Sequence, residues 1–328
     1  MLEILRIAPL SGVQDAGRSG WRSLGVPHSG PLDAWSHAVA NVLVGNAPDA
    51  AAVEIGSGRS QLRFDRAAVI ALAGARTPVQ AGGMSLPLWR PIAVAAGTLV
   101  SIDPPLLGAR SYLAVAGGFK SEIVLGSRSA SMRGEGFPAL LRRGDTLPYD
   151  PTASQRLPAM PAATSIDRPR IAPWWADGEP LLDLDGQAGL RVIEGSHLHL
   201  LQDRRALFTQ GFELSPQTNR MAAPLRGKSL EISNAGSLIS EPVVPGSVQL
   251  PPDGLPLILL AEAQTIGGYA RIAHVASIDL ARLAQRRPGS VIRFEPVSVA
   301  AAQRLWLWRR ERLMRLRIAA LARLLEKR

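Results

Sequence analysis

The amino-acid sequence predicts a mainly β protein with a few helices, organised as two β-rich halves. Short apolar runs alternate with turns along most of the chain, whose 328 residues include 31 glycines and 26 prolines. Frequent short runs between Gly- and Pro-containing turns are typical of a β-barrel or a sandwich, not of alternating βαβ units. A hydrophobic content of 46% with 20% charged residues indicates a folded chain that can bury a sizeable core.

Residues 1–150 are predicted to form an N-terminal β-rich domain with one helix. The helical pattern follows Ser29, which we expect to be the N-cap, with Pro31 early in the helix and Gly45-Asn46 at its end. Free backbone N–H groups at this N-terminus would suit an anion, and an ordinary capped surface helix is the alternative. The strands expected after the helix lie at residues 60–64, 67–73, 91–102 and 112–116.

Residues 151–180 are predicted to be a Pro-rich linker, because six prolines break any regular pattern there. A second β-rich domain is predicted at residues 181–300. In it, His197 and His199 are expected on one face of a strand, but no third ligand lies at metal spacing, so no metal site is predicted. The other elements expected here are a strand from residue 190, a turn-rich loop at 212–227 and a short helix from Ser277.

Residues 301–328 are predicted to be a basic amphipathic helical tail. Residues 304–328 contain nine basic and two acidic residues, which accounts for +7 of the net charge of +10. Because the basicity belongs to the tail and not to a face of the folded body, no nucleic-acid partner is predicted. We expect the tail to dock on its own domain or on a partner protein, with a membrane surface as the alternative. Its predicted apolar side consists of Met314, Ile318, Leu321 and Leu325.

The composition also bounds the chemistry and the cellular location. There is no cysteine, which excludes disulfides, thiolate metal sites and cysteine nucleophiles. The longest apolar stretch, residues 67–75, is far too short for a membrane span. Glu3 stands where a signal peptide would carry basic residues. These observations predict a cytoplasmic protein without a transmembrane segment.

The first candidate site follows a buried strand predicted at 257–261. Acid, amide, hydroxyl and guanidinium groups surround the pair Gly267-Gly268, whose missing Cβ atoms permit a tight turn and the close approach of a ligand. Such a set suits a small polar or anionic molecule, in particular a small amide. An ordinary β-turn with polar side chains facing water is the alternative. The other residues predicted to bind substrate are Gln264, Thr265, Tyr269 and Arg271, with Gln249 and Arg220 beside them.

A second candidate cluster lies in the glycine-punctuated stretch 12–46, whose polar side chains suit anions and amides. The polar loop 126–134 is long enough to be a binding loop, and a plain surface loop is the alternative. No residue is assigned as catalytic in either candidate site. The members of the second cluster are Gln14, Asp15, Arg18, Ser29, Gly30 and Asp33.

Missing motifs also limit the function. Neither a G-x-x-x-x-G-K-[ST] phosphate loop nor a G-x-S-x-G nucleophile elbow occurs. The three lysines, Lys120, Lys228 and Lys327, lie outside the Met-Lys-Met setting in which biotin is normally attached. We therefore expect this chain alone to bind no cofactor, and any ATP or carboxybiotin to be supplied by partner proteins.

Several ordered motifs resemble one protein family. The segments VQDAGRSG, GVPHSGPLD and ANVLVGN are similar to the pattern VQDxGRxG…GVPxSGxxDxxxxxxANxLVGN. Towards the C-terminus, VPGSVQ and QTIGGY are similar to VPGxxQ…QTxGGY. The chain is identified as a member of the biotin-dependent carboxyltransferase family, also called allophanate hydrolase subunit 2, which includes the C-type subunit of 5-oxoprolinase. The resemblance covers residues 5–295.

This resemblance implies a cyclophilin-like β-barrel in the C-terminal half, and a small amide substrate handled together with a companion B-type subunit (allophanate hydrolase subunit 1-like). The function it implies is the C-type subunit of an ATP-dependent 5-oxoprolinase. That enzyme is a hydrolase that opens 5-oxoproline to L-glutamate with its A-type and B-type subunits, and this chain alone is expected to be inactive. An alternative is the carboxyltransferase half of a biotin-dependent urea carboxylase or allophanate hydrolase-type system. A further alternative is a non-catalytic regulatory partner of a B-type kinase-inhibitor protein.

Two stretches depart from the family pattern. The family usually has Asp-Arg before Gln-Thr, where this chain has Glu262-Ala263. It usually has R-M-G-Y-R-L-x-G, where this chain has RMAAPLRG with Ala222, Ala223 and Pro224. Because two arginines and a tyrosine of the family pattern are missing, a non-catalytic role stands beside turnover as a hypothesis.

Overall fold

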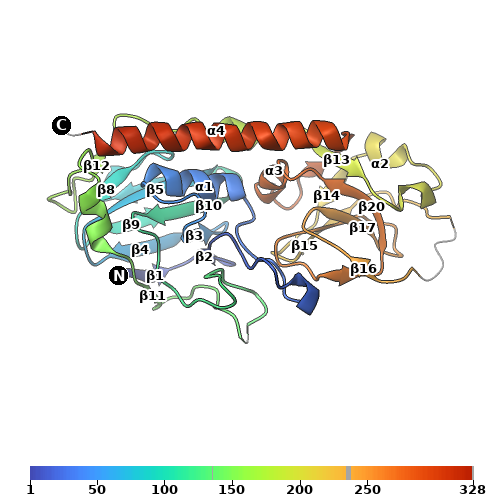
Figure 1. The fold of residues 1–328 in the computed structure, drawn as a ribbon, viewed down its shortest axis with the longest axis horizontal. Helices are drawn as coiled ribbons and strands as arrows, with labels where there is room; N and C mark the ends of the chain where they lie inside the picture. The colour runs from blue at the N-terminus through green and yellow to red at the C-terminus, as the bar shows by residue number, and fades with distance from the viewer. Residues whose placement is uncertain (135, 234–237, 327–328) are drawn as a thin grey trace.

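The computed structural model describes residues 1–134, 136–233 and 238–326, so the last two residues of the predicted tail, 327–328, lie outside the described part. Two β-rich bodies lie side by side, and one long helix, α4 (Val299–Leu325), runs along both of them (Figure 1). The predicted mainly β fold with two β-rich halves is confirmed. Within the described residues, no helix is both long enough and apolar enough to cross a lipid bilayer.

The N-terminal half is a sandwich of two six-stranded antiparallel sheets. The first sheet has the spatial order β11 (Thr146–Leu147), β1 (Leu2–Arg6), β4 (Ser60–Phe64), β9 (Leu99–Ile102), β6 (Val79–Ala81) and β7 (Met84–Ser85). The second sheet has the order β12 (Arg170–Ile171), β8 (Ile92–Val94), β5 (Ala68–Arg76), β10 (Leu107–Val115), β3 (Ala52–Ile55) and β2 (Gly12–Gln14).

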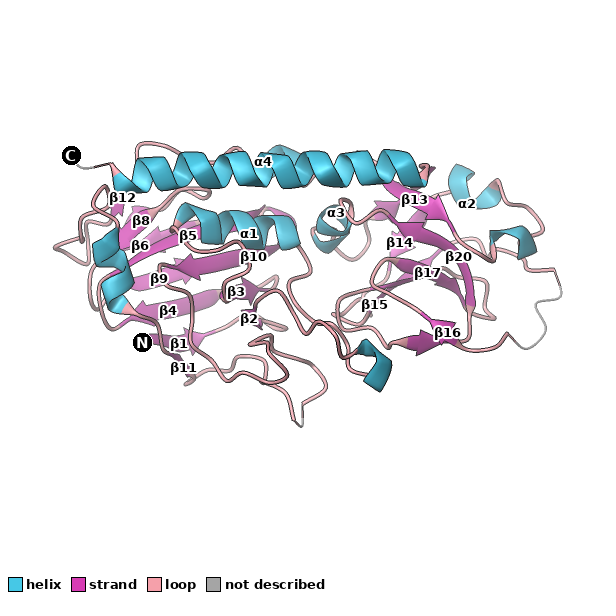
Figure 2. Cartoon of the chain, viewed as in Figure 1, coloured by secondary structure: helices cyan, strands magenta, loops and turns pink. Residues whose placement is uncertain are grey.

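Strand β5 is apolar up to its last residue, Arg76, because both of its faces are buried before that point. Ile70 and Leu72 belong to the core between the two sheets. Ala71 and Ala73 belong instead to the apolar cluster under helix α1 (Ala34–Leu43), which lies between the second sheet and α4 (Figure 2). The continuous apolar run at this strand is thus the pattern expected of a strand covered on both sides.

The C-terminal half contains an eight-stranded sheet that curls into a nearly closed barrel. Its edge strands, β21 and β22, are separated in sequence by Arg293 alone, so the two edges of the sheet come together. The barrel predicted for this half is confirmed. The spatial order is β21 (Val291–Ile292), β14 (Phe212–Leu214), β15 (Ala222–Arg226), β18 (Leu257–Leu259), β17 (Ser247–Leu250), β20 (Ala270–Val275), β13 (Leu190–Glu194) and β22 (Phe294–Pro296).

A separate two-stranded ribbon is formed by β16 (Glu241–Pro242) and β19 (Ile266–Gly267) on the side of the barrel. The region predicted as a linker, 151–180, carries the 3-10 helices η2 (Pro151–Arg156) and η3 (Glu179–Leu181). It also supplies β12, which pairs with β8 at the edge of the N-terminal sandwich. The domain boundaries proposed from the sequence stay predictions.

Helix α1 begins later than the sequence predicted. Ser29 is not the N-cap, because its φ of 58° lies in the left-handed region and its N–H donates to the Ala261 carbonyl. Asp33 is the N-cap, since its carboxylate accepts the N–H of Ser36 at 2.9 Å. The predicted end is confirmed, because the helix ends two residues before Gly45, whose φ is 78°.

Two local predictions in the C-terminal half are wrong. Region 212–227 is not a turn-rich loop, because it contains β14 and β15, which pair as neighbouring barrel strands. His197 and His199 do not share a strand, because the chain turns there into the 3-10 helix η4 (Leu198–Leu200). The short helix expected from Ser277 is present as α3 (Leu280–Ala284).

The apolar face predicted for the tail is not the face that packs on the body. Leu324 is fully buried, whereas the neighbouring Leu325 is 56% exposed. The reason is that α4 carries a second apolar row, which packs against α1 and the N-terminal half and, at Ala302, against the C-terminal half. That inner row includes Ala302, Leu313, Leu316, Ala320 and Leu324.

Candidate functional site

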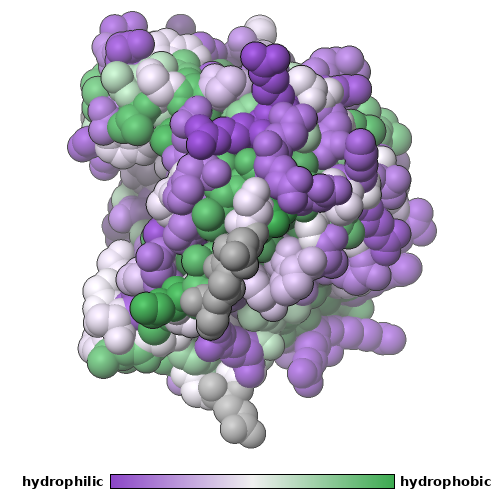
Figure 3. All heavy atoms as spheres, turned by 90° about the vertical axis from the view of Figure 1, so that its right-hand side faces the viewer, coloured by the Kyte–Doolittle hydropathy of each residue, from purple (hydrophilic) through white to green (hydrophobic). Residues whose placement is uncertain are grey.

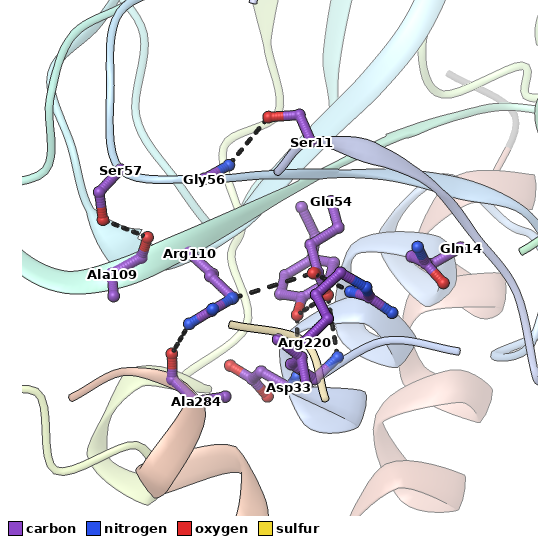
Figure 4. Close-up of polar contacts among 12 residues, drawn as sticks. Ser11, Gln14, Asp33, Glu54, Gly56, Ser57, Ala109, Arg110, Arg220 and Ala284 are labelled. Atoms are coloured by element: carbon purple, nitrogen blue, oxygen red, sulfur yellow. Dashed lines mark hydrogen bonds and ion pairs between the residues drawn. The ribbon is translucent and has the colours of Figure 1, made fainter. Parts of the chain in front are cut away.

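A buried ion cluster joins the two halves. Arg220, in the turn before β15, is fully buried and forms ion pairs with Glu54 of β3 and with Glu262, which follows β18. Its Nε lies 2.5 Å from Glu262 Oε1, and its Nη2 donates to the Gly30 carbonyl at 2.6 Å. Arg110 of β10 also points toward Glu54, with its Nε 3.9 Å from Oε1 (Figure 4). We call Glu54, Arg110, Arg220 and Glu262 the junction cluster.

Hydrogen bonds extend the junction cluster beneath α1. The Tyr112 hydroxyl donates to Glu54 Oε2 at 2.7 Å and accepts the N–H of Asp33 at 2.8 Å. The Asp33 carboxylate accepts from Nε2 of Gln285 at 2.7 Å. Gln285, at the end of α3, also accepts the N–H of Ala109 through its Oε1 at 2.9 Å. The two halves are therefore held by hydrogen bonds as well as by ion pairs.

Burial and nearby charges act in opposite directions on these acids. Burial raises the pKa of Glu54, but the charges of Arg220 and Arg110 and the hydrogen bond from Tyr112 lower it below its ordinary value. For Asp33, burial outweighs the hydrogen bonds and raises the pKa. Burial and the charge of Glu54 raise the pKa of Tyr112 well above its ordinary value. Tyr112 is thus a neutral donor to an ionised Glu54.

The guanidinium of Arg220, at the centre of the junction cluster, makes its hydrogen bonds to groups of the protein. The three guanidinium nitrogens of Arg220 contact Glu262, Glu54 and the Gly30 carbonyl. The N–H groups that lead into α1 are occupied too, since that of Leu32 donates to Glu54 at 2.9 Å. Of the N–H groups around this helix start, those of Leu32, Asp33 and Ser36 therefore donate to groups of the protein. The cluster acts as a structural link between the halves.

A cavity of about 290 Å³ lies at the junction of the two halves, and we call it the junction cavity. Leu32 contributes to its apolar wall from one half, and Leu260 and Ala261 from the other. A mostly apolar cavity with a few convergent polar groups, placed between two domains, suits a small organic ligand. The polar side chains that line it are Asp15, His28, Ser29, His37 and Asp49, of which Asp15 and Ser29 belong to the second predicted cluster.

Asp15 is held as an ionised carboxylate by the loop 126–134. It accepts hydrogen bonds from the hydroxyls of Ser127 and Ser129, and the N–H of Arg128 donates to it at 2.6 Å. Burial raises the pKa of Asp15, but these hydrogen bonds outweigh it and lower the pKa below the ordinary value. The loop predicted as a binding loop therefore positions a wall of the junction cavity.

Gln14 and Arg18 of the second predicted cluster lie behind this wall. Gln14 Nε2 donates to the Ala130 carbonyl at 3.3 Å, and Arg18 Nη2 donates to the Ser129 carbonyl at 2.5 Å. The Arg18 guanidinium also stacks 4.8 Å from the centre of the Phe137 ring. Both residues fasten the N-terminal segment to the loop 126–134.

His37 is a functional candidate that the sequence analysis missed. It lies on α1, lines the junction cavity, and its Nε2 lies 2.9 Å from the Gln14 carbonyl oxygen. A carbonyl oxygen accepts only, so Nε2 carries the proton and Nδ1 keeps its lone pair. Burial lowers the pKa of His37, so the ring is neutral near neutral pH. In the sequence it is one His inside an apolar helical pattern, which usually indicates a core position.

A second polar cluster lies between the ribbon and the barrel. Gln249 of β17 and Arg271 of β20 are paired across the two strands, and Glu241 of the ribbon forms an ion pair with Arg271. Gln249 is buried, and neither its Oε1 nor its Nε2 has a hydrogen-bond partner among the described residues. A Cβ at Gly267 would lie 2.6 Å from Gln249 Nε2, so the Gln249 side chain would have to shift to admit any other residue there. We call Glu241, Gln249, Gly267 and Arg271 the ribbon cluster.

The remaining residues of the first predicted site are divided between two places. Thr265 is buried and Gln264 half-buried, both directly before the ribbon strand β19. Gly268 and Tyr269 line a separate cavity of about 750 Å³ at the far end of the barrel. The structure thus brings together Gln249, Gly267 and Arg271, and it places Arg220 in the junction cluster.

Exposed apolar side chains gather around the ribbon, and Figure 3 shows apolar atoms among polar ones at this end of the molecule. The 3-10 helix η1 (Arg22–Leu24) from the N-terminal half joins this surface, because Arg22 Nη2 donates to the Val243 carbonyl beside the ribbon. We call this surface the ribbon patch. Its exposed apolar residues are Leu24, Ile239, Val244, Ile266 and Tyr269.

Of the positions that depart from the family pattern, Glu262, Ala263 and Ala223 are buried, and Ala222 and Pro224 are half-buried. Glu262 keeps a carboxylate, which pairs with Arg220. Ala263 belongs to a small apolar cluster with Val243, and Ala223 is fully buried in the barrel core.

As for metals, the described ranges contain no group of three or more His, Asp or Glu residues placed to hold an ion.

Known proteins match the chain over most of its length. The family model described as "Carboxyltransferase domain, subdomain A and B" matches residues 24–296. The C-type subunit of the 5-oxoprolinase of Escherichia coli (strain K12) is 33% identical over 308 residues, which cover 92% of this chain and 93% of that protein. The urea amidolyase of Lachancea kluyveri is 29% identical over 89% of this chain, but the match covers 17% of that protein.

The same fold occurs in a solved urea-processing enzyme. The crystal structure of the Kluyveromyces lactis urea carboxylase is 26% identical and superimposes with a TM-score of 0.84 over 96% of this chain. The match covers 29% of that longer chain. This chain therefore corresponds to nearly the whole of the Escherichia coli protein, and to one region of the urea-processing proteins.

Proposed function

This chain belongs to the family of the carboxyltransferase domain, subdomain A and B, and from that premise we propose that it is the C-type subunit of a 5-oxoprolinase. The observation that carries the proposal is the 33% identity over 93% of the Escherichia coli protein. In this function the chain is one component of a hydrolase that opens 5-oxoproline to L-glutamate. The regulatory alternative gains no support from the relatives named above.

We place the cyclic amide substrate in the junction cavity. The cavity is small, about 290 Å³, and both halves contribute to its walls. Its apolar surfaces suit a five-membered ring, and its few polar side chains can orient the amide and the carboxylate. The ribbon cluster, named from the sequence as the substrate site, is the second place to test, because the amide of Gln249 has no partner among the described residues.

His37 is the residue we assign to proton transfer. Opening a cyclic amide needs a proton removed from the attacking nucleophile and a proton delivered to the ring nitrogen. A neutral imidazole with a free Nδ1 lone pair can accept the first, and the lowered pKa of His37 keeps it in that form. The Gln14 carbonyl fixes this tautomer, and the bonds of Asp15 to the loop 126–134 hold the adjacent backbone in place.

We further propose that the companion is a B-type subunit and that it covers the ribbon patch. Exposed apolar residues are gathered there, as at a protein interface. A partner at this surface would also bring hydrogen-bonding groups toward the ribbon cluster. ATP would enter with an A-type subunit, since this sequence has no phosphate loop. We expect the assembly to be cytoplasmic and this chain alone to be inactive.

A carboxyltransferase function is the second candidate. The TM-score of 0.84 to the Kluyveromyces lactis urea carboxylase favours it, as does the description of the family model. In that case the same small cavity would hold urea, and carboxybiotin would be presented by another domain. The two candidates differ in the substrate consumed and in the co-substrate required.

The test is reconstitution of this chain with A-type and B-type subunits. We expect 5-oxoproline and ATP to yield glutamate, measured by chromatography, and urea with carboxybiotin to be unchanged. His37→Gln should lower kcat by about 100-fold or more, because a positioned general base typically contributes that much. His199→Gln, an exposed histidine on η4, is the matched control and should keep full activity.

The outcomes separate the function from the site. If the reconstituted complex carboxylates urea and forms no glutamate, the second candidate, a carboxyltransferase function, is the correct one. Glutamate formation with a fully active His37→Gln complex would leave the function standing and remove His37 from proton transfer. The melting temperature of each variant must be measured alongside, because His37 is buried and its loss could unfold the chain instead.

A further inference from the structure

Helix α4 carries two apolar faces, and among the residues that the structure describes only the inner face is covered by the rest of the chain. The inner face packs on the body through residues such as Leu316 and Leu324. The outer apolar residues are largely exposed, with Leu307 at 56% and Ile318 at 64%. Leaving so much aliphatic surface in water on a rigid helix is unfavourable by the hydrophobic effect. We call the outer row, Leu307, Met314, Ile318, Leu321 and Leu325, the outer seam.

The outer seam is narrow and regular. Its members follow one another at intervals of seven, four, three and four residues, which is the spacing of a heptad pattern. At 3.6 residues per turn, they fall within about a sixth of the helix circumference. One heptad position in the row is charged, since Glu311 stands between Leu307 and Met314, but it is paired with Arg315 at 2.6 Å.

Both borders of the outer seam are basic. Arg310 and Arg317 lie along one side, and Arg304 and Arg315 along the other. In the described part of α4, the ion pairs are Arg315 with Glu311 and Arg323 with Glu326, both within the helix. No acidic group of the body is paired with this outer surface in the described residues, so the charges of Arg304, Arg310 and Arg317 are available to a partner.

These features discriminate among three occupants. A second copy of this chain would bring arginines against arginines at the borders of the seam, which is repulsive. A membrane-surface helix buries a broad apolar face. Here the two exposed tryptophans of α4, Trp306 and Trp308, lie about 100° to either side of the seam, and the guanidinium groups of Arg310 and Arg312 stack on them, so they do not widen it. A partner helix with its own apolar seam and acidic borders complements both the shape and the charge.

We propose that the outer seam of α4 docks an acidic amphipathic helix of a partner protein in a coiled-coil-like packing. The apolar rows interdigitate, and Asp or Glu residues of the partner lie opposite the bordering arginines. The surface lies beyond residue 296, where the family match ends, and along the outside of the molecule. It is distinct from the junction cavity and from the ribbon patch, so it does not depend on the proposed 5-oxoprolinase function.

The experiment measures binding of two synthetic peptides to the full-length protein by fluorescence anisotropy. The probe peptide has about four heptads with Leu at a and d and Glu at e and g. The control peptide keeps the glutamates and replaces each Leu by Gln. We expect the probe to bind at least about tenfold more tightly than the control, since burying several leucines exceeds 1.4 kcal/mol.

Two matched variants locate the contact. Ile318→Lys removes an exposed apolar residue of the seam without removing positive charge, and should weaken probe binding by about tenfold. Ala319→Lys introduces the same side chain at the adjacent exposed position, outside the seam, and should leave the affinity within about twofold. Because both positions are exposed, neither change should lower the melting temperature.

Several results would overturn the proposal. Equal binding of both peptides would mean that charge alone attracts them. Dimers in sedimentation equilibrium that Ile318→Lys dissociates would assign the seam to a second copy of this chain. Binding to phosphatidylglycerol vesicles that depends on Ile318, with no preference for the probe peptide, would assign it to a membrane surface.

Discussion

The junction cluster and the ribbon cluster are polar clusters beside the barrel, built around the buried side chains of Arg220 and Gln249, and they differ in how many of their hydrogen-bonding groups have partners within the chain. In the junction cluster, the three nitrogens of Arg220 contact protein acceptors, and Glu54 accepts from Tyr112 and Leu32 besides. In the ribbon cluster, the side-chain amide of Gln249 has no partner among the described residues. A satisfied network specifies a structure, whereas a buried group left unpaired is a place where binding can add a partner.

The two clusters also differ in what they join. Glu54 and Arg220 come from opposite halves, so the junction cluster holds the walls of the junction cavity at a fixed separation. Gln249 and Arg271 come from one barrel sheet and meet the ribbon, which borders an exposed apolar surface. The comparison assigns stability to the first cluster and recognition to the second.

The largest expected effect is on Arg220. Arg220→Met should lower the free energy of unfolding by about 3–5 kcal/mol, because it leaves Glu54 and Glu262 buried without their cation. Urea unfolding followed by circular dichroism measures this. Arg226→Met, an exposed arginine on the same β15, is the control and should change stability by less than about 0.5 kcal/mol. If Arg220→Met lowered the free energy of unfolding only slightly, the junction cluster could not be assigned to stability.

Substitution of Gln249 should change the free energy of unfolding less than substitution of Arg220, and without destabilising the protein. Gln249→Leu should leave stability unchanged or raise it by about 1 kcal/mol, since it removes an unsatisfied amide from a buried site. In the reconstituted complex it should lower activity or the affinity for the companion subunit about tenfold or more, because the group that the complex brings to the amide would lose its hydrogen-bond partner.

Gln285→Leu is the control for this prediction, because it makes the same change of side chain at a buried glutamine that has hydrogen-bond partners. Gln285 bonds Asp33 and the backbone of residues 109 and 110, so its loss should cost about 1–3 kcal/mol of stability. If Gln249→Leu were destabilised as much as Gln285→Leu, the ribbon cluster would be structural and its place in recognition would be lost.

The smallest expected effect is the dependence of stability on pH. The lowered pKa of Glu54 means that its contribution is present above the ordinary value of 4.5 and is lost as the pH falls through the folded pKa. Asp33 acts in the opposite sense, because its raised pKa favours the folded state as it becomes protonated. One group contributes a slope of at most about 1.4 kcal/mol per pH unit.

Thermal unfolding of the wild type and of Glu54→Gln, from neutral pH down to about pH 3, checks this prediction. The difference in melting temperature between the two proteins should be constant above pH 4.5 and should shrink below it. A difference that grows as the pH falls would contradict the lowered pKa of Glu54.

Much of the fold could be predicted from local patterns in the sequence. The alternation at residues 60–64 and the apolar run before Arg76 correspond to β4 and β5, and the end of α1 was predicted from Gly45. The start of α1 could not be predicted in the same way. Ser29 has the side chain of an N-cap, but a contact with Ala261, more than 200 residues away, draws its N–H elsewhere.

The candidate sites show the same limit. Gln249 and Arg271 lie together because they are paired on adjacent strands of the barrel sheet, and the ribbon places Gly267 against Gln249. Arg220 was grouped with them and lies instead in the junction cluster. His37 was missed, because a histidine in an apolar helical pattern carries no sign that a cavity will form beside it.

By itself the sequence determined the class of fold, the family, and the presence of a basic amphipathic helix at the C-terminal end. These follow from periodicity, turn residues and ordered motifs, which are local properties of the chain. The tertiary structure alone decided which face of α4 is covered, which acids meet Arg220, and which buried amide stays unpaired. The physical reason is that burial, pKa and hydrogen-bond satisfaction depend on groups brought together from distant segments, and no single segment encodes them.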